Sequence, residues 1–164
     1  MSRAHVRESD GDAPEDLPEL PLSRHPNYVT PRGLAMLQAR LGALEADIAG
    51  LTPEAADHRQ RRAALDRERR WLVARIASAQ PVGGARPADR VAFGARVTVI
   101  DEQGATTRYR IVGEDEAEPE AGLISWTSPL ARALIGLAVG DVATWPRPAG
   151  DCDIEVQAIA FPDD

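Results

Sequence analysis

The stretch "TPRGLAMLQARLGALEADIAGL", residues 30–51, predicts a helix with one apolar face. Thr30 is a favoured N-cap residue and Pro31 suits the first helical position, because the first N–H groups of a helix lack internal partners. Large apolar residues then recur at spacings of three and four, which is the heptad pattern of a coiled-coil seam. They are Leu34, Leu37, Leu41, Leu44, Ile48 and Leu51. We expect packing along this seam to hold the helix, since Gly42 in its middle costs about 1 kcal/mol relative to Ala.

A second helix is expected to run back along the first. Gly50 can adopt the left-handed conformation that ends a helix, and Thr52-Pro53 repeats the Thr-Pro start signal. The segment "EAADHRQRRAALDRERRWLVARIASA", residues 54–79, then has helical periodicity. Its apolar seam consists of Leu65, Leu72, Ile76 and Ala79. The short connection predicts an antiparallel helical hairpin over residues 30–80, with arms of about 30 and 40 Å at 1.5 Å per residue.

The first 29 residues differ from the hairpin in composition. They are rich in Pro, Asp, Glu and Ser and hold few large apolar side chains, so they cannot bury enough surface to offset the entropy of ordering. We therefore predict a disordered acidic tail over residues 1–29. The formal net charge of the whole chain is −7. Because an acidic chain gains little from the phosphate backbone, direct binding to duplex nucleic acid is not expected.

After a Pro/Gly linker at residues 81–88, apolar residues recur at every second position. Val91, Phe93, Ala95, Val97 and Val99 alternate with smaller or polar residues, which is typical of a strand. Further strands are expected at "TTRYRIVG" (106–113), at "LISW" (123–126) and on both sides of "PAGD" (148–151). "SPLARALIG" (128–136) has the start and end signals of a short helix. The pattern predicts an α+β domain over residues 89–164, with a mostly antiparallel sheet, one helix and, at residues 114–120, a solvated acidic loop.

Several classes of protein are disfavoured by the composition. No apolar run approaches the roughly eighteen residues of a membrane span, and no signal peptide is recognisable, so we expect a cytoplasmic protein with no membrane partner. The single Cys152 agrees with a reducing compartment, and no Cys/His spacing suggests a metal site. Cys152 falls on the apolar side of a strand together with Ile154 and Val156, which predicts a buried thiol. A chain of 164 residues is expected to form a single core.

Several motifs occur in one order along residues 28–161. They are "YVTPRGLAMLQARL" (28–41), "YRIVGEDEAEPEAGLIS" (109–125), "SPLARALIGLAVGD" (128–141) and the strand pair around "PAGD". In this order they resemble the Gre (GreA/GreB) family of bacterial transcription elongation factors. The resemblance implies an antiparallel two-helix coiled coil followed by an FK506-binding-protein-like (FKBP-like) domain. It also implies RNA polymerase as partner, with the C-terminal domain at the rim of the secondary channel and the hairpin inside it.

The expected hairpin tip, "LTPEAAD" (51–57), holds Glu54 and Asp57 three positions apart. In cleavage-competent family members an acidic pair at the tip helps hold magnesium in the polymerase active centre and so activates water for RNA cleavage. The resemblance makes Glu54 and Asp57 candidates for sharing that magnesium, whereas no cofactor of the chain's own is expected. The Gly-Asp, Asn and Tyr parts of the family pattern are absent. The hairpin also looks shorter by about sixteen residues, roughly 12 Å per arm.

A second interpretation of the tip assigns it no chemistry. Both acids would then occupy the first turn of the second helix, where the helix dipole favours an acid by about 0.3 to 1 kcal/mol. The shortened hairpin also resembles the regulator of nucleoside diphosphate kinase, a polymerase-binding relative without the acidic tip. We therefore predict no strong cleavage stimulation.

The resemblance places the polymerase contact at the start of the short helix. By position it falls on Thr127, Ser128 and Pro129, with Arg132 one turn later. Trp126 alternates with Ile124 on the preceding strand, so one of the two is expected to face outward, and an exposed Trp126 would anchor the contact. The alternative is that Ser128 and Pro129 only start the helix.

Together these observations predict a regulator of transcription elongation that is an accessory factor and not an enzyme. Nucleic acid would be met only indirectly, within the transcription complex. The alternative is a transcript cleavage factor that uses Glu54 and Asp57. A prolyl isomerase is disfavoured because such enzymes line an apolar pocket with aromatics, and only 4% of this chain is aromatic. A coiled-coil dimer would need a second exposed apolar seam, for which Trp71 and Val73 are the only large candidates, so a monomer is expected.

Overall fold

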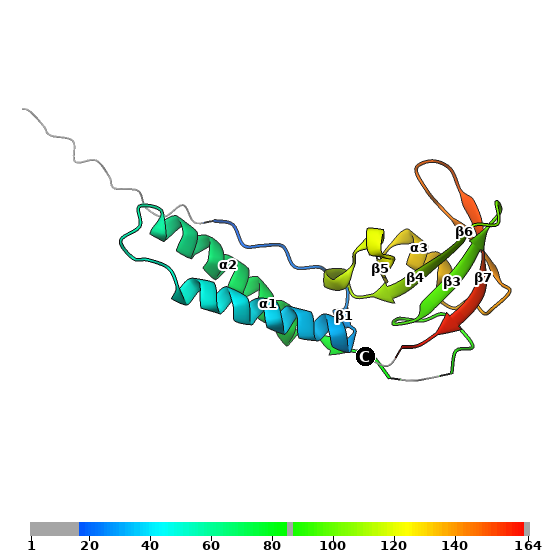
Figure 1. Cartoon of the computed structure of the whole chain (residues 1–164), viewed down its shortest axis with the longest axis horizontal. Helices are drawn as coiled ribbons and strands as arrows, with labels where there is room; N and C mark the ends of the chain where they lie inside the picture. The colour runs from blue at the N-terminus through cyan, green and yellow to red at the C-terminus, as the bar shows by residue number, and fades with distance from the viewer. Residues whose placement is uncertain (1–16, 85–86, 163–164) are drawn as a thin grey trace, which may run out of the picture.

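Two helices lie side by side at one end of the molecule and a curled sheet lies at the other (Figure 1). The computed structural model describes residues 17–84 and 87–162. The first sixteen residues of the expected tail, and residues 85–86 of the expected linker, lie outside this range. Within it, no helix is both long enough and apolar enough to cross a membrane.

The helical hairpin forms where the heptad pattern predicted it. Helix α1 spans Pro31–Ala49 and α2 spans His58–Ala77. Thr30 Oγ1 accepts a hydrogen bond from the backbone N–H of Gly33 at 2.9 Å, which confirms the predicted N-cap. At 1.5 Å per residue the arms are about 28 and 30 Å long, so the second is shorter than expected.

The two helices pack along the predicted seam. Leu37, Leu44 and Leu72 are buried between them. Half-buried apolar side chains extend this cluster: Leu41, Ile48, Leu65, Trp71 and Ile76. The supercoil that would make the hairpin a coiled coil stays a prediction.

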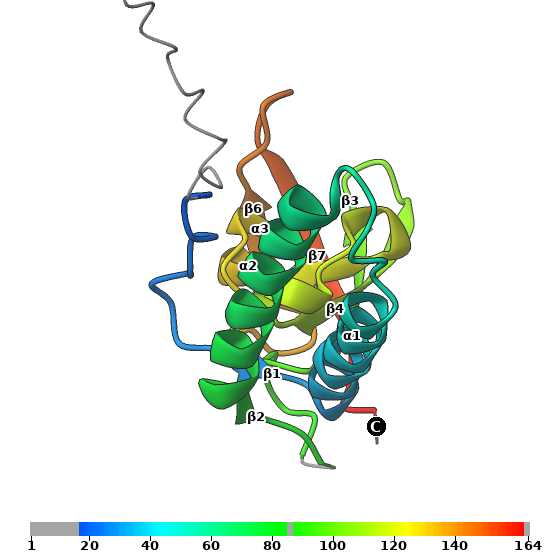
Figure 2. The same cartoon turned by 90° about the vertical axis from the view of Figure 1, so that its left-hand side faces the viewer.

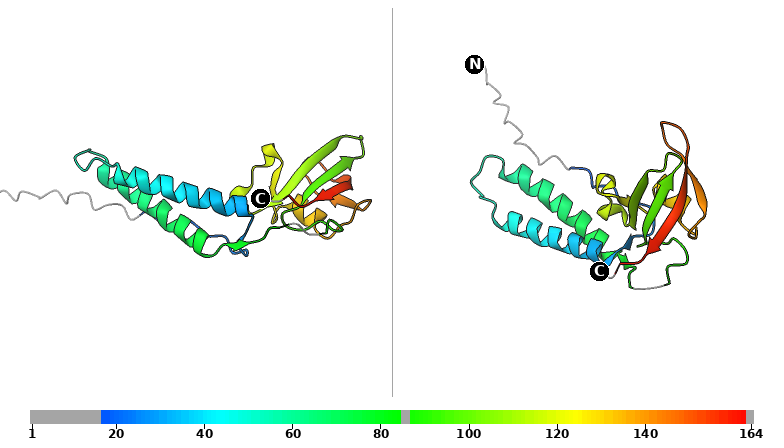
Figure 3. Two further views of the ribbon diagram at one scale, coloured as in Figure 1. Left: turned by 60° about the horizontal axis from the view of Figure 1, so that its bottom comes forward. Right: turned by 45° about the vertical axis from the view of Figure 1, so that its right-hand side comes forward.

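A five-stranded sheet forms the C-terminal half of the molecule. Its strands are β3 (Arg96–Asp101), β4 (Thr106–Val112), β5 (Leu123–Ser125), β6 (Val142–Trp145) and β7 (Cys152–Ala160). Their spatial order is β5-β4-β3-β7-β6, and β5 alone runs parallel to its neighbour. Two short 3₁₀ helices, η1 (Glu114–Glu116) and η2 (Pro119–Ala121), connect β4 to β5, and helix α3 (Pro129–Leu134) connects β5 to β6. This mixed α+β arrangement confirms the predicted class (Figure 3), and the FKBP likeness stays a prediction.

The sheet and α3 enclose a core of their own. Val97, Ile111, Leu134 and Val156 are all fully buried there. Cys152 is also buried in this core, as its position on the apolar side of the strand predicted. The hairpin closes a smaller seam of its own, so residues 17–84 and 87–162 form a large apolar cluster in the sheet domain and a small one in the hairpin. The expectation of a single core is wrong.

Residues 17–29 do not form the predicted disordered tail. They run along α2 toward the sheet, and in Figure 2 α2 stands between them and α1. The segment ends in β1 (Tyr28–Val29), which pairs in parallel with β2 (Gln80–Pro81), so the expected linker also begins in a strand. Composition suggested disorder because it averages over the segment, whereas a few residues at its end provide the anchoring: Asn27 and Val29 are buried.

Candidate functional site

The hairpin tip is a loop, and α2 starts later than predicted. Gly50 caps α1 with φ −83°, so the expected left-handed conformation is wrong there. Thr52 and Pro53 do not open the second helix. The chain instead makes successive turns, with the N–H of Ala55 donating to Thr52 O at 3.1 Å and the N–H of His58 donating to Ala55 O at 3.0 Å. The loop therefore extends over residues 50–57.

Glu54 and Asp57 lie in this loop rather than in the first turn of α2. The expectation that they share a helical face is wrong, and so is the interpretation that both complement the dipole from inside the helix. Glu54 is exposed. Asp57 occupies the N-cap position without a side-chain capping bond, and its Oδ2 lies 3.9 Å from Nε of Arg61. The loop thus presents two solvated carboxylates, one of them beside a cation.

The tip also borders a hollow of about 520 Å³ between the ends of the two helices. Asp47 and Asp57 line it together with Arg61 and apolar groups such as Leu51 and Leu65. Its walls carry both signs of charge, so they favour no single ionic ligand. Within residues 17–84 and 87–162, no three His, Cys, Asp or Glu side chains lie together as a metal site.

The second group of candidate residues, Trp126 to Arg132, forms one continuous segment, which we call the docking segment. Ser128 Oγ accepts a hydrogen bond from the N–H of Ala131 at 3.2 Å and Pro129 takes the first helical position, so both start α3 as predicted. The hydroxyls of Thr127 and Ser125 lie 2.7 Å apart. Pro129 and Arg132 are exposed, which leaves them the most accessible members of the segment.

Trp126 is half-buried and does not stand free as an anchor. Its ring packs edge-on against Tyr28, with centroids 5.2 Å apart, and against His25 at 5.8 Å. Ile124 is buried, and Trp126, just beyond the end of β5 at Ser125, packs against the same core. The expectation that one of the two faces outward is therefore wrong. The indole N–H makes no hydrogen bond with any described residue. Trp126 therefore links the docking segment to the N-terminal segment that runs along the hairpin.

The acidic stretch after β4 joins the two halves of the molecule, which the sequence did not predict. Glu116 is only 4% exposed. Its carboxylate accepts hydrogen bonds from the hydroxyl of Thr30 and, at 3.3 Å, from Arg32. It thus lies at the start of α1, where the helix dipole favours a negative charge. The expectation of a solvated loop is wrong for η1, because its acids pair with groups on the hairpin.

Arg75 of α2 is the cationic centre of this junction and is also 4% exposed. Its Nε donates to Asp115 Oδ2 at 2.6 Å, and its NH2 group donates to Asn27 Oδ1 at 2.7 Å. Asn27 donates in return to the backbone carbonyl of Arg75 at 2.7 Å. A buried cation needs such partners, since an unpaired one would carry the full cost of desolvation. The network fixes the hairpin to the sheet domain.

Two glycines permit this close approach. A Cβ atom on Gly113 would lie 2.5 Å from the backbone oxygen of Tyr28, and one on Gly33 would lie 2.6 Å from Glu116 Oε2. Arg75 could have been noticed in the sequence, because it interrupts an apolar stretch between Leu72 and Ile76. Its acidic partners, forty residues away, carry no local signal.

Comparisons with known proteins agree with the expected family. Residues 86–161 match the family model described as "Transcription elongation factor, GreA/GreB, C-term". A Transcription elongation factor GreA from Anaeromyxobacter sp. (strain K) is 49% identical over 88 residues, which are 52% of this chain and 53% of that protein. A GreA from Ralstonia nicotianae is 34% identical over 152 residues, covering 81% of this chain and 96% of the relative.

Solved structures with detectable similarity include the "Prokaryotic transcription elongation factor GreA/GreB from Nitrosomonas europaea". It is 21% identical, with a TM-score of 0.42, and the match covers 82% of this chain and 98% of that one. With some sequence relatives the match is partial, so that the chain spans only about half of their length. The Ralstonia relative is matched almost from end to end, through both the hairpin and the sheet domain. The chain belongs to the GreA/GreB family of transcription elongation factors.

Proposed function

We propose that this protein regulates transcription elongation by binding RNA polymerase, with the docking segment on the rim of the secondary channel and the hairpin inside it. The observation that carries the proposal is the similarity to a GreA transcription elongation factor over 96% of that relative's length. The protein would act in the cytoplasm as a monomeric accessory factor, while the polymerase performs the chemistry. It would meet nucleic acid only within the transcription complex. The relation to the regulator of nucleoside diphosphate kinase stays a prediction.

We further propose that cleavage stimulation is weak or absent. Two carboxylates cannot hold magnesium alone, so Glu54 and Asp57 could only add oxygen ligands to an ion that the polymerase holds. Catalysis of this kind needs ligands that are fixed in position before the reaction. Here Glu54 lies in a loop outside both helices, and Asp57, at the N-cap of α2, lies beside Arg61, which would compete with a metal ion. The tip therefore supports occupancy of the channel better than catalysis.

Transcript cleavage is the second candidate function. Its supporting observation is that both carboxylates are exposed at the end of the hairpin that lies away from the sheet. If cleavage occurs, replacing both residues with Ala should abolish it while polymerase binding remains, because docking does not depend on these oxygens.

The docking proposal predicts that Arg132→Glu weakens polymerase binding by about tenfold or more. Arg132 is exposed on α3, so reversing its charge should disturb a contact without disturbing the fold. Ser128→Ala is a poorer test, because the loss of its capping bond destabilises α3 by itself. The binding constant with core polymerase can be measured by fluorescence anisotropy.

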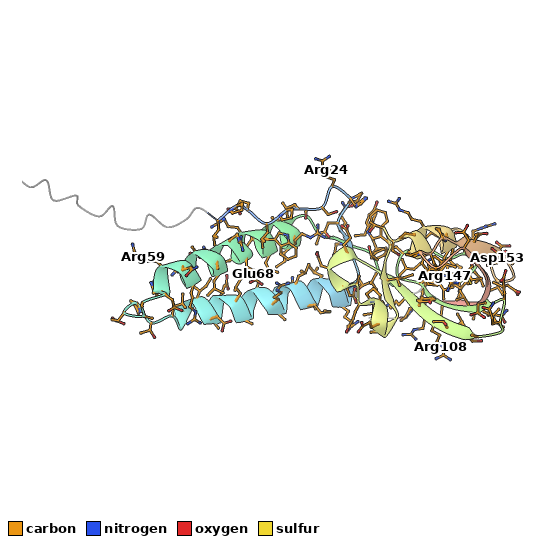
Figure 4. All side chains as sticks on the ribbon, turned by 90° about the horizontal axis from the view of Figure 1, so that it is seen from above. Arg24, Arg59, Glu68, Arg108, Arg147 and Asp153 are labelled. Atoms are coloured by element: carbon orange, nitrogen blue, oxygen red, sulfur yellow. The ribbon has the colours of Figure 1, made fainter. Side chains whose placement is uncertain are left out.

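The matched control is Arg108→Glu, the same charge change at an exposed position on β4. Figure 4 shows Arg108 projecting from the sheet. The Arg108→Glu variant should bind polymerase as tightly as the original protein. If both variants bind polymerase as tightly as the original protein, Arg132 does not take part in the contact.

A further inference from the structure

The N-terminal segment covers one face of α2. Residues 17–24, here called the cover segment, contact three α2 side chains. Arg67 donates a hydrogen bond to the backbone oxygen of Pro18 at 3.3 Å. The indole N–H of Trp71 donates one to the backbone oxygen of Pro21 at 3.2 Å. Between them, Arg70 donates to Glu19 Oε1 from Nε at 3.0 Å and from NH2 at 2.6 Å.

These three side chains form one continuous strip. Positions 67, 70 and 71 are three and four residues apart, so they project from the same side of the helix. Figures 1, 2 and 4 all show α2 between α1 and the cover segment, so the strip lies on the flank of α2 that the segment covers. At Trp71 this flank reaches the hairpin seam, where the ring also lies 5.7 Å from the guanidinium of Arg40 on α1. The cover segment thus adds a third layer to a two-helix rod.

The cover segment is fixed at one end and weakly held along its length. At the fixed end, Asn27 is buried and exchanges hydrogen bonds with Arg75. Along the segment, the side chains of Glu19 and Arg70 are 63% and 53% exposed. Water screens such a pair, so it contributes little to holding the segment. The segment can therefore leave α2 while its anchored end keeps it close enough to return.

The chemistry of the strip indicates what it can bind. The Arg70 hydrogen bonds lower the pKa of the Glu19 carboxyl from its ordinary value, because they favour its ionised form. Arg67, Arg70 and the Trp71 indole donate hydrogen bonds to a carboxylate and two backbone carbonyls of an extended chain. A guanidinium that holds a carboxylate with two N–H groups is selective for that geometry. The strip is suited to an acidic protein surface.

We propose that the cover segment is an autoinhibitory element that competes with an acidic surface of RNA polymerase for the strip of Arg67, Arg70 and Trp71. This rests on the proposed function, because it assigns the strip to the same binding event. With the cover segment bound, the hairpin is thicker, so it must release this segment to enter a channel or fit the channel less well. Displacement of the cover segment would then be part of polymerase binding.

The test uses two variants of the full chain that detach the cover segment by opposite changes of charge. Glu19→Arg places a cation against Arg70, and Leu20→Asp puts an acid at a half-buried position of the segment. In a ¹⁵N–¹H spectrum the indole signal of Trp71, one of three Trp residues, should shift in both variants. Both should bind polymerase at least about fivefold more tightly than the original protein. Glu102→Arg, in the exposed turn between β3 and β4, is the charge-matched control and should change neither quantity.

The outcomes separate this proposal from the proposed function. If the original protein and both detached variants bind polymerase equally, the cover segment does not compete and the inference is wrong. If only Glu19→Arg binds more tightly, the gain comes from charge and the inference is again wrong. If no form binds polymerase, the proposed function itself fails, and the competition fails with it.

Discussion

Replacing Arg75 with Ala is expected to destabilise the protein by about 2 to 4 kcal/mol, because it leaves the buried Asn27 amide oxygen and the partly exposed Asp115 carboxylate without a partner. Arg75 is 4% exposed and bonds both Asp115 and Asn27. Without its guanidinium, these groups lose hydrogen bonds that water cannot fully replace. The free energy of unfolding, from urea titration followed by circular dichroism, measures the loss.

Arg62→Ala is the matched control on the same helix. Arg62 bonds Asp66 at 2.7 Å, but its side chain is 45% exposed. A surface pair of this kind should cost no more than about 1 kcal/mol. Equal losses in the two variants would show that the junction does not stabilise the protein more than a surface ion pair does.

Leu72→Ala is expected to cost about 2 to 5 kcal/mol, since it opens a cavity in the hairpin seam. Leu72 is fully buried with Leu37 and Leu44. The hairpin has few other large buried residues, so much of its helical signal should be lost at a lower temperature. Thermal unfolding monitored at 222 nm gives this result.

Val73→Ala tests whether the stability lost in Leu72→Ala is caused by the burial of that side chain. Val73 neighbours Leu72 on α2 but is 50% exposed. Its truncation should change stability by no more than about 0.5 kcal/mol. A large loss for Val73→Ala, or none for Leu72→Ala, would contradict the observed packing of the seam.

Several features that depend on residues close together in the sequence were predicted correctly. Thr30 and Ser128 each precede a Pro and each accept the capping bond expected of them. The heptad spacing found the seam because side chains three and four apart share a helix face. The alternation at Cys152 found a buried thiol for the corresponding reason in a strand.

The junction could not be predicted from local chemistry. Arg75 meets Asp115 and Glu116 meets Thr30 across 40 and 86 positions of the chain. A run of acids is usually solvated, and only the folded chain shows which of them have cationic or hydroxyl partners. The ordered N-terminal segment was missed for the same reason, since its anchor Asn27 bonds a residue 48 positions away.

The start of the second helix was mispredicted because the tip contains a helix-start signal that the folded chain does not use. Thr52-Pro53 has the composition of a helix start, yet α2 begins only at His58. The turns that intervene are closed by their own backbone hydrogen bonds. The acidic pair therefore lies in a loop rather than on one face of a helix.

The most direct test of the central claim adds the purified protein to stalled, backtracked elongation complexes and measures binding and RNA length together. We predict that the protein binds these complexes and leaves the RNA at its original length. A matched protein in which Glu54 and Asp57 are both Ala should behave in the same way. RNA shortening by the original protein that is lost in the double variant would contradict this account and make the tip catalytic. Absence of binding would contradict the proposed function altogether.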